Sequence, residues 1–294
     1  MNNTSNSLVS GIDPASFSAV TGPAQDLFRY VNGPWIDMYR LPDDRSRYGS
    51  FDKLAEDAEN QIREILEDDD CPAEKSHALY ASFLDVDAIN ASGLAAIEDQ
   101  LKAIDVAADK AELTRSLGAM NPAGGPDLIG IAVYGDPGAP ETNIIHIEQS
   151  GLGLPDEAYY REDHYAPIRE AYADMVAKQL KNAKLAADDE QAEAQAQRFL
   201  DVETRIAANH WDNVATRDSV KTYNPTDYAE LSGMLADYDL DTWIESWQSA
   251  YDQTSAAQVQ PLDFRGIFNH VVVHEPSFLT GLNAFWKAAD LDDL

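Results

Sequence analysis

The side chains best suited to hold a metal ion in this sequence are six histidines: His77, His146, His164, His210, His270 and His274. Only His270 and His274 have the i, i+4 spacing that places two imidazoles on one face of a helix. A metal-binding helix of that kind also needs a glutamate directly after the first histidine as general base, and Val271 stands there. Three consecutive valines favour a strand, in which residues i and i+4 lie too far apart to chelate one ion. The sequence therefore predicts that this chain binds no metal.

Residue patterns for other catalytic chemistry are also missing. There is no phosphate-binding loop, no dinucleotide glycine fingerprint and no Gly-x-Ser-x-Gly elbow. The single cysteine, Cys71, lies beside three aspartates, whose charges disfavour its thiolate. Among 52 acidic residues, a carboxylate pair such as Glu203 with Asp212 cannot be distinguished from chance. We therefore predict no catalytic residue in this chain.

Arg47 and Asp52 are the remaining candidates, because they flank a predicted helix N-terminus in the stretch RYGSFD. An arginine in this position can offer its planar guanidinium to a carboxylate, with Asp52 orienting it or accepting a backbone N–H. The structural alternative is that Arg47 makes an internal ion pair and that Asp52 interacts with the helix dipole. From the spacing alone, the structural alternative is preferred.

The elements that would position these residues are mostly helices. Residues 1–25 read as a polar lead-in, and DLFRYVNGPW at 26–35 ends in a predicted Asn-Gly-Pro turn. A helix capped by Ser50 follows, and its regularly spaced apolar residues predict that one face is buried: Phe51, Leu54, Ala58, Ile62, Ile65 and Leu66. The period then changes to that of a β-hairpin near 128–148, and two long antiparallel helices are expected near 163–185 and 189–210. A helix stop is predicted at Tyr223–Pro225, followed by short helices to about residue 252. The predicted fold is therefore mainly α with one small hairpin.

Composition narrows the possible partners. The chain of 294 residues has 21 basic and 52 acidic residues, a formal net charge of −31, and 44% hydrophobic residues. This is the composition of a globular protein whose field repels phosphate backbones and anionic lipid, so we expect neither nucleic acid nor membrane as a partner. The surface acidity itself indicates solubility or a salty environment. One cysteine, no secretory signal and no long apolar run predict a cytoplasmic protein.

Four stretches, taken in order, resemble the neprilysin family of zinc metallopeptidases, which includes endothelin-converting enzyme and bacterial PepO oligopeptidases. They are DLFRYVNGPW at 26–35, DRSRYGSFDKL at 44–54, QSGLGLPDEAYY at 149–160 and RDSVKTYNP at 217–225. The opening Ser10–Asp13 also resembles cytoplasmic bacterial members, which lack a membrane anchor. The resemblance implies that residues 26–294 form the N-terminal, helical, substrate-gating part of a two-lobed peptidase, truncated before the catalytic zinc domain.

In that family the zinc motif HExxH and a later glutamate ligand lie in the C-terminal portion, and neither occurs here. The resemblance thus implies a parent zinc metalloendopeptidase that hydrolyses short peptides, with this part inactive alone and lacking its catalytic lobe. It also implies that Arg47 contacts the free C-terminal carboxylate of a bound peptide and that Asp52 lines the same subsite. Ala55 replaces a second arginine of the animal enzyme, so this subsite is less basic. The alternative is a stand-alone helical binding or scaffold module without a catalytic half.

Overall fold

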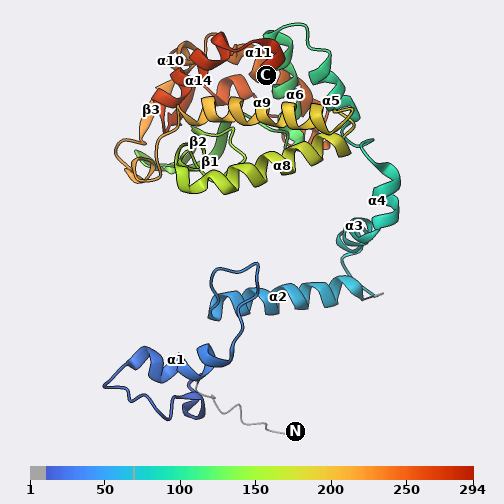
Figure 1. Ribbon diagram of the computed structural model, residues 1–294. Helices are drawn as coiled ribbons and strands as arrows, with labels where there is room; N and C mark the ends of the chain where they lie inside the picture. The colour runs from blue at the N-terminus through green and yellow to red at the C-terminus, as the bar shows by residue number, and fades with distance from the viewer. Residues whose placement is uncertain (1–10, 69) are drawn as a thin grey trace. The chain divides into compact units, whose positions relative to one another are not determined.

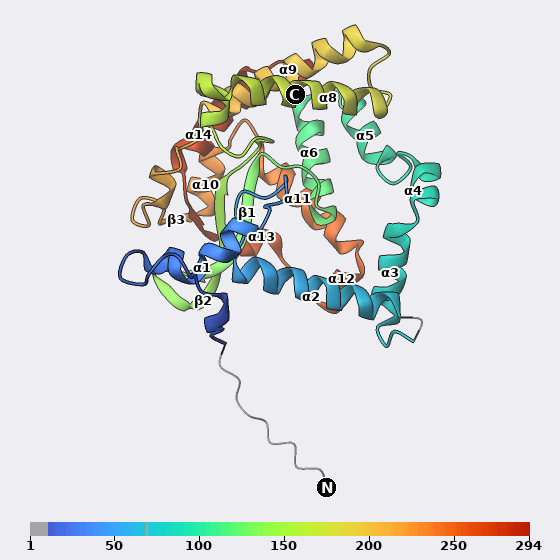
Figure 2. The ribbon, with the colours of Figure 1, turned by 60° about the horizontal axis from the view of Figure 1, so that its bottom comes forward.

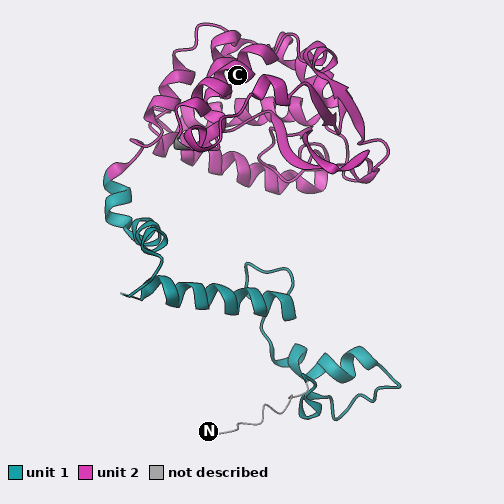
Figure 3. Ribbon diagram, turned by 180° about the vertical axis from the view of Figure 1, so that it is seen from behind, with its two compact units in different colours: residues 1–91 teal, residues 92–294 magenta. Residues whose placement is uncertain are grey.

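The computed structural model describes residues 11–68 and 70–294, which divide into two compact units, residues 1–91 (unit 1) and residues 92–294 (unit 2) (Figures 1 and 3). Residues 1–10 of the predicted lead-in, including Ser10, lie outside the described residues. Most of the described chain is helical, which confirms the mainly α prediction. None of the helices described is long and apolar enough to span a bilayer.

The described part of unit 1 contains the α-helices α1 (Leu27–Met38), α2 (Ser50–Glu67) and α3 (Glu74–Leu84), with α4 (Val86–Ser92) at its boundary. The helix predicted from Ser50 is confirmed, but Ser50 is not its cap. Gly49 precedes the helix in an extended conformation, and its N–H donates to Oδ2 of Asp52 at 2.8 Å. Asp52 therefore satisfies a backbone donor that helix geometry leaves unpaired, close to the positive end of the helix dipole.

The predicted Asn-Gly-Pro turn at the end of residues 26–35 is wrong, because α1 continues through Pro34. A proline inside a helix cannot donate to the carbonyl four residues earlier, here that of Tyr30. In this structure the Tyr30 carbonyl accepts a hydrogen bond from the Ser18 N–H instead, at 2.7 Å. Gly33 tolerates the backbone strain that a proline imposes on the residue before it. A distant backbone donor thus offsets the cost that the sequence pattern predicts.

The prediction that α2 buries one face is also wrong for the described structure. None of its residues is buried, although the expected apolar stripe is present. Four side chains of that stripe are largely exposed: Phe51 at 88%, Leu54 at 62%, Ile62 at 56% and Ile65 at 54%. An amphipathic helix gains little stability from such a stripe until another surface removes it from water.

Unit 2 contains the remaining helices and the sheet (Figures 1 and 2). Its helices are α5 (Glu98–Asp105), α6 (Lys110–Met120), α7 (Ala158–Arg161), α8 (Ala166–Asn182), α9 (Asp189–Ala207), α10 (Tyr228–Met234), α11 (Leu240–Asp252), α12 (Ser255–Val259), α13 (Phe264–Ile267) and α14 (Pro276–Ala288). The predicted pair of long helices is confirmed: α8 and α9 pack side by side, joined by the short connection at 183–188. Asp188 caps α9 by accepting the Gln191 N–H at 2.9 Å.

The predicted hairpin is also confirmed and belongs to a larger sheet. Strands β1 (Ile129–Asp136) and β2 (Ala139–Gln149) pair antiparallel, and β4 (His270–Val273) and β3 (Asn224–Asp227) extend them in the order β1-β2-β4-β3. β2 pairs with β4 in parallel, and β4 pairs antiparallel with β3. The sequence predicted only a helix stop at Tyr223–Pro225. That prediction is wrong in part, because strand β3 begins at Asn224. Its proline is tolerated because β3 is an edge strand.

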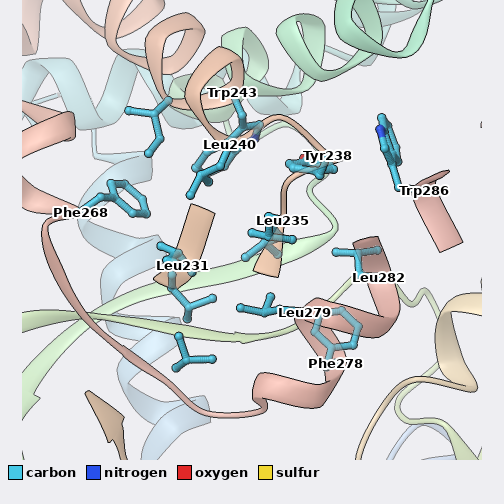
Figure 4. Packing of buried hydrophobic residues seen from close by; sticks show 14 of the residues in the cluster. Leu231, Leu235, Tyr238, Leu240, Trp243, Phe268, Phe278, Leu279, Leu282 and Trp286 are labelled. Atoms are coloured by element: carbon cyan, nitrogen blue, oxygen red, sulfur yellow. The ribbon is translucent and has the colours of Figure 1, made fainter. Parts of the chain in front are cut away.

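The main core lies in unit 2, between the sheet and helices α10, α11 and α14 (Figure 4). Its largest fully buried side chains include Trp243, Trp286, Tyr238, Phe268 and Phe278. Burying an aromatic side chain of this size contributes about 1.5–3 kcal/mol to folding. This cluster therefore holds together the sheet and helices to which the loops of unit 2 are attached.

Candidate substrate-contacting site

Arg47 and Asp52, the two residues predicted to contact substrate, lie at the connection between α1 and α2 in unit 1. Asp52 is half-buried in the first turn of α2, where its carboxylate accepts the Gly49 N–H. Arg47 is exposed, and no acidic side chain among the described residues lies within ion-pair distance of its guanidinium. The structural alternative assigned Asp52 to the helix end, and this geometry agrees with that assignment. The internal ion pair imagined for Arg47 is not present among those residues.

The residues on either side of Arg47 are held in place by Glu56 on the second turn of α2. The Tyr48 hydroxyl donates to Glu56 Oε2 at 2.7 Å, and Arg45 Nη2 lies 3.7 Å from Glu56 Oε1. The hydrogen bond to Glu56 raises the pKa of Tyr48 above its usual value, because ionisation would place two negative charges side by side. Glu56 is therefore engaged by Tyr48 and Arg45.

Three stacked aromatic rings anchor the same connection to α1. The Tyr39 ring lies 4.6 Å from both the Trp35 and the Tyr48 ring centroids, with interplanar angles of 20° and 27°. Offset stacks of this kind add about 0.5–1.5 kcal/mol to the area that they bury. The backbone around Arg47 is thus held from both sides, although its own side chain is exposed to solvent.

This arrangement has a definite chemical capability. An exposed guanidinium on an anchored backbone presents a planar set of N–H donors that matches a carboxylate. Ala55, three residues after Asp52, adds no second positive charge. Among the described residues of this connection, two exposed guanidinium groups without an ion-pair partner, those of Arg40 and Arg47, can therefore bind a carboxylate.

The stretch QSGLGLPDEAYY has a structural role in unit 2, centred on Glu203 of α9. The Glu203 carboxylate accepts the Gly153 N–H at 2.9 Å, the Tyr160 hydroxyl at 2.8 Å and the Tyr172 hydroxyl at 3.2 Å. Burial raises the pKa of Glu203, and these three donors oppose the shift. Gly151 adopts a left-handed conformation with φ of 87°, which glycine accepts without strain.

Sequence reasoning dismissed Glu203 as one acid among many, but a signal was present. The buried positions of α9 recur at spacings of three or four, and Glu203 falls in that series between Leu200 and Ile206. A carboxylate on the apolar face of a helix requires buried donors. The companion in the dismissed pair, Asp212, is exposed, and its carboxylate accepts the Val214 and Ala215 N–H groups at 2.8 Å.

The remaining motifs are structural as well. The Gln149 side chain accepts the Trp211 N–H at 2.7 Å and donates to the Trp211 carbonyl at 3.0 Å. Asp218 accepts the Lys221 N–H at 3.2 Å and closes the turn before β3. Asn283 of α14 has a similar role, because its Oδ1 accepts the Asp237 N–H at 2.7 Å.

The histidines do not form the pair that the spacing suggested. His270 begins β4, as the valine run predicted, and His274 follows that strand. His274 instead contacts His146 of β2, with 2.8 Å between His146 Nδ1 and His274 Nε2. Burial lowers the pKa of His274, His146 lowers it further, and Glu148 raises it. Across residues 11–68 and 70–294, no group of three or more His, Cys, Asp or Glu side chains is arranged to hold a metal ion.

Comparison with known proteins relates residues 23–294 to the family model described as Peptidase family M13. The chain is 25% identical to human neprilysin over 309 aligned residues, which cover 95% of this chain and 40% of the relative. It is 26% identical to endothelin-converting enzyme 1 of Rattus norvegicus, with 97% of this chain and 36% of the relative covered.

Solved structures agree with these relationships. The inhibitor complex of Mycobacterium tuberculosis zinc metalloprotease Zmp1 matches with a TM-score of 0.82 and 31% identity, covering 97% of this chain and 42% of Zmp1. PepO from Lactobacillus rhamnosis matches with a TM-score of 0.71 at 20% identity, which shows a shared fold. The chain thus spans about two fifths of the length of these relatives.

Proposed function

The chain belongs to peptidase family M13, the neprilysin family, and corresponds to its N-terminal portion; from that premise we propose that it gates and lines the substrate cavity of a zinc metalloendopeptidase that cleaves short peptides. In this proposal the chain is inactive alone. Catalysis requires the remaining part of the parent enzyme.

Arg47 is the observation that carries the proposal. In the other three family-like stretches, at 26–35, 149–160 and 217–225, polar side chains form caps, turns and buried networks, although Arg217 is exposed without an ion-pair partner among the described residues. The stretch at 44–54 contains an arginine without an ion-pair partner among the described residues, on a backbone anchored by Tyr48. We assign Arg47 to the C-terminal carboxylate of a bound peptide. Asp52 lines the same subsite and holds the turn that presents Arg47.

The exposed stripe of α2 supports a partner for unit 1. Phe51, Leu54, Ile62 and Ile65 form an apolar surface on an amphipathic helix, and burying such a surface is the main source of stability for a helix of this kind. The catalytic lobe of the parent enzyme is the partner that we assign to this surface. A scaffold module would use the same surface for a different protein, and that is the alternative.

Zinc belongs to the parent enzyme in this proposal. A catalytic zinc site needs three protein ligands drawn from His, Glu, Asp or Cys, and the described residues provide no such group. The residues present therefore do not fit the metal, and no chemical step is assigned to them. We also propose a cytoplasmic location, in keeping with a single cysteine that has no internal disulfide partner. Fractionation of the source cells tests that location.

Substitution of Arg47 in the complete enzyme tests the proposed contact. Arg47→Met should lower kcat/KM for peptides with a free C-terminal carboxylate by about ten- to a hundredfold, because a charge-assisted pair in a partly dry cavity is worth about 1.5–3 kcal/mol. Matched amidated peptides never form the pair and should lose little. Arg45→Met is the control, since Arg45 pairs with Glu56 on the same connection. Equal losses on acid and amide substrates would assign Arg47 a structural role, and the melting temperatures would show whether the fold itself is damaged.

The alternative makes a different prediction for the gene. Sequencing past codon 294 should reveal an HExxH motif if the chain is part of a peptidase, because zinc ligation in this family requires that motif. A natural stop codon at that point favours the scaffold module. Recombinant expression of the whole reading frame, with metal analysis and a chelator-sensitive peptidase assay, then separates an enzyme from a binding module.

A further inference from the structure

The outer edge of strand β1 has main-chain groups that no described residue pairs with. β1 is the first strand in the order β1-β2-β4-β3, so only one of its sides faces another strand. On the far side of β2, the His274 N–H donates to the Ile147 carbonyl at 2.9 Å, which directs the main-chain groups of Ile147 toward β4. Successive residues in a strand alternate, so the main chain of His146 faces β1, where its partner in the register is Ala132.

The same alternation determines which groups of β1 point outward. Because Ala132 faces β2, the N–H and C=O groups of Ile131 and Val133 point away from the sheet. Neither residue has a main-chain hydrogen bond to another described element on that side. Side chains near the end of the strand are exposed as well, Val133 at 64% and Tyr134 at 58%.

This edge also lacks the usual protection against pairing. Natural edge strands are commonly blocked by charged side chains, especially lysine, or by proline. Residues 129–135 of β1, IGIAVYG, contain neither, in a chain in which 25% of residues are charged. The one charged residue of the strand, Asp136 at its end, is buried and accepts the Tyr223 hydroxyl at 2.8 Å, so the outward groups of Ile131 and Val133 are open to another strand.

We propose that β1 is a docking strand for an extended peptide, which adds to the sheet through its own main chain. This rests on the proposed function, because the peptide is a substrate held away from the scissile bond. Strand addition takes affinity from main-chain hydrogen bonds and so tolerates many sequences. The occupant is a neutral or basic peptide. A second copy of the chain would bring a further net charge of −31 to the same place and is repelled.

The test uses the 294-residue chain and a labelled peptide of alternating Thr and Val with a lysine at each end. Val133→Pro removes the outward N–H and keeps the Ala132 and Tyr134 bonds to β2, since proline is accepted at an edge position and favours extended backbone before it. Fluorescence anisotropy should show binding to the wild type that is about fivefold weaker in Val133→Pro, the effect of one main-chain hydrogen bond. Val133→Thr keeps the N–H and should bind as the wild type does.

Two further measurements separate a loss of peptide binding from a loss of folding. Hydrogen exchange at the Val133 amide of the wild type should slow when the peptide is added, which needs no variant to fold. Circular dichroism confirms that Val133→Pro keeps its fold. Absence of peptide binding, equal binding by all variants, or edge pairing between two copies in sedimentation would overturn the proposal. Because no cleavage is measured, such a result leaves the Arg47 experiment unaffected.

Discussion

Asp127 provides a quantitative test of the structure of unit 2. It precedes β1, where its carboxylate accepts the Asn121 side-chain N–H at 2.9 Å and the Ile129 N–H at 3.3 Å. The hydroxyl of the fully buried Tyr238 lies 3.5 Å from Oδ1. Burial raises the pKa of Asp127 from 3.8 to about 6, because these donors do not replace all the hydration that the charged form loses.

The direction of the pH effect follows from this raised pKa. In the unfolded chain Asp127 ionises near pH 4, but in the folded chain it does so near pH 6. Folding therefore favours the protonated form of Asp127. The contribution of this group to the free energy of unfolding is fully present below about pH 4 and is lost as the pH rises through about 6. Each pH unit between the two values is worth about 1.4 kcal/mol, so the charged carboxylate costs about 3 kcal/mol above pH 7.

Asp127→Asn should remove this cost, because an amide, like a protonated carboxyl group, is neutral and has one acceptor oxygen and one donor group. We expect the variant and the wild type to be equally stable near pH 4, and the variant to be about 2–3 kcal/mol more stable at pH 8. Urea denaturation followed by tryptophan fluorescence measures the difference across this range. Glu141→Gln, on the exposed start of β2, is the control for the loss of one negative charge from the chain. A flat curve for Asp127→Asn, or a loss of stability at pH 8, would refute the reasoning.

Two further predictions concern stability. Tyr160→Phe removes the hydroxyl that donates to Glu203 at 2.8 Å and accepts the Leu154 N–H at 3.0 Å, so urea denaturation should show a loss of about 1–3 kcal/mol. Tyr134→Phe, whose side chain is exposed, should lose less than about 0.5 kcal/mol, and equal losses would contradict the assigned network. The net charge of −31 predicts that the melting temperature rises with KCl between 0.1 and 1 M, because the screening length falls from about 10 to about 3 Å. A melting temperature independent of KCl would show that carboxylate repulsion is unimportant.

The parts of the fold that the sequence predicted are those with a local cause. The pair α8 and α9 and the hairpin of β1 and β2 each repeat one hydrophobic period over many residues, and their partners are neighbours in the chain. Strand β3 was missed, and the strand that the valine run predicted at β4 could not be assigned a partner, because each has only four residues and its pairing is distant. Val272 of β4 pairs with His146, and no periodicity connects segments so far apart.

The error at α1 has a similar origin. Asn-Gly-Pro is a reliable turn signal when the carbonyl that proline leaves unpaired has no other donor. In this fold, the Ser18 N–H meets the Tyr30 carbonyl, so the helix continues. Such a rescue depends on a tertiary contact and cannot be read from the three residues themselves.

Only part of the candidate site could be predicted from the sequence, because the rest depends on tertiary contacts. The types and order of Arg47 and Asp52 predicted a carboxylate-binding group beside a helix end, but not which arginine keeps its guanidinium free. That depends on Glu56, which accepts the Tyr48 hydroxyl and lies near Arg45. A helix position nine residues away thus decides the role of Arg47.

The motifs that identify the family carry different amounts of functional information. Asp26, Gln149 and Asp218 satisfy backbone groups of this chain, so they stabilise the fold whether it serves a peptidase or a scaffold. Arg47 is different from these three residues, and so is Arg217, since no acidic side chain among the described residues pairs with either guanidinium, and an exposed arginine contributes little to folding by itself. The match to the family thus supports the fold through many residues, whereas the link to peptide cleavage depends chiefly on Arg47. The paired acid and amide substrates therefore test the proposed function more directly than any measurement of stability.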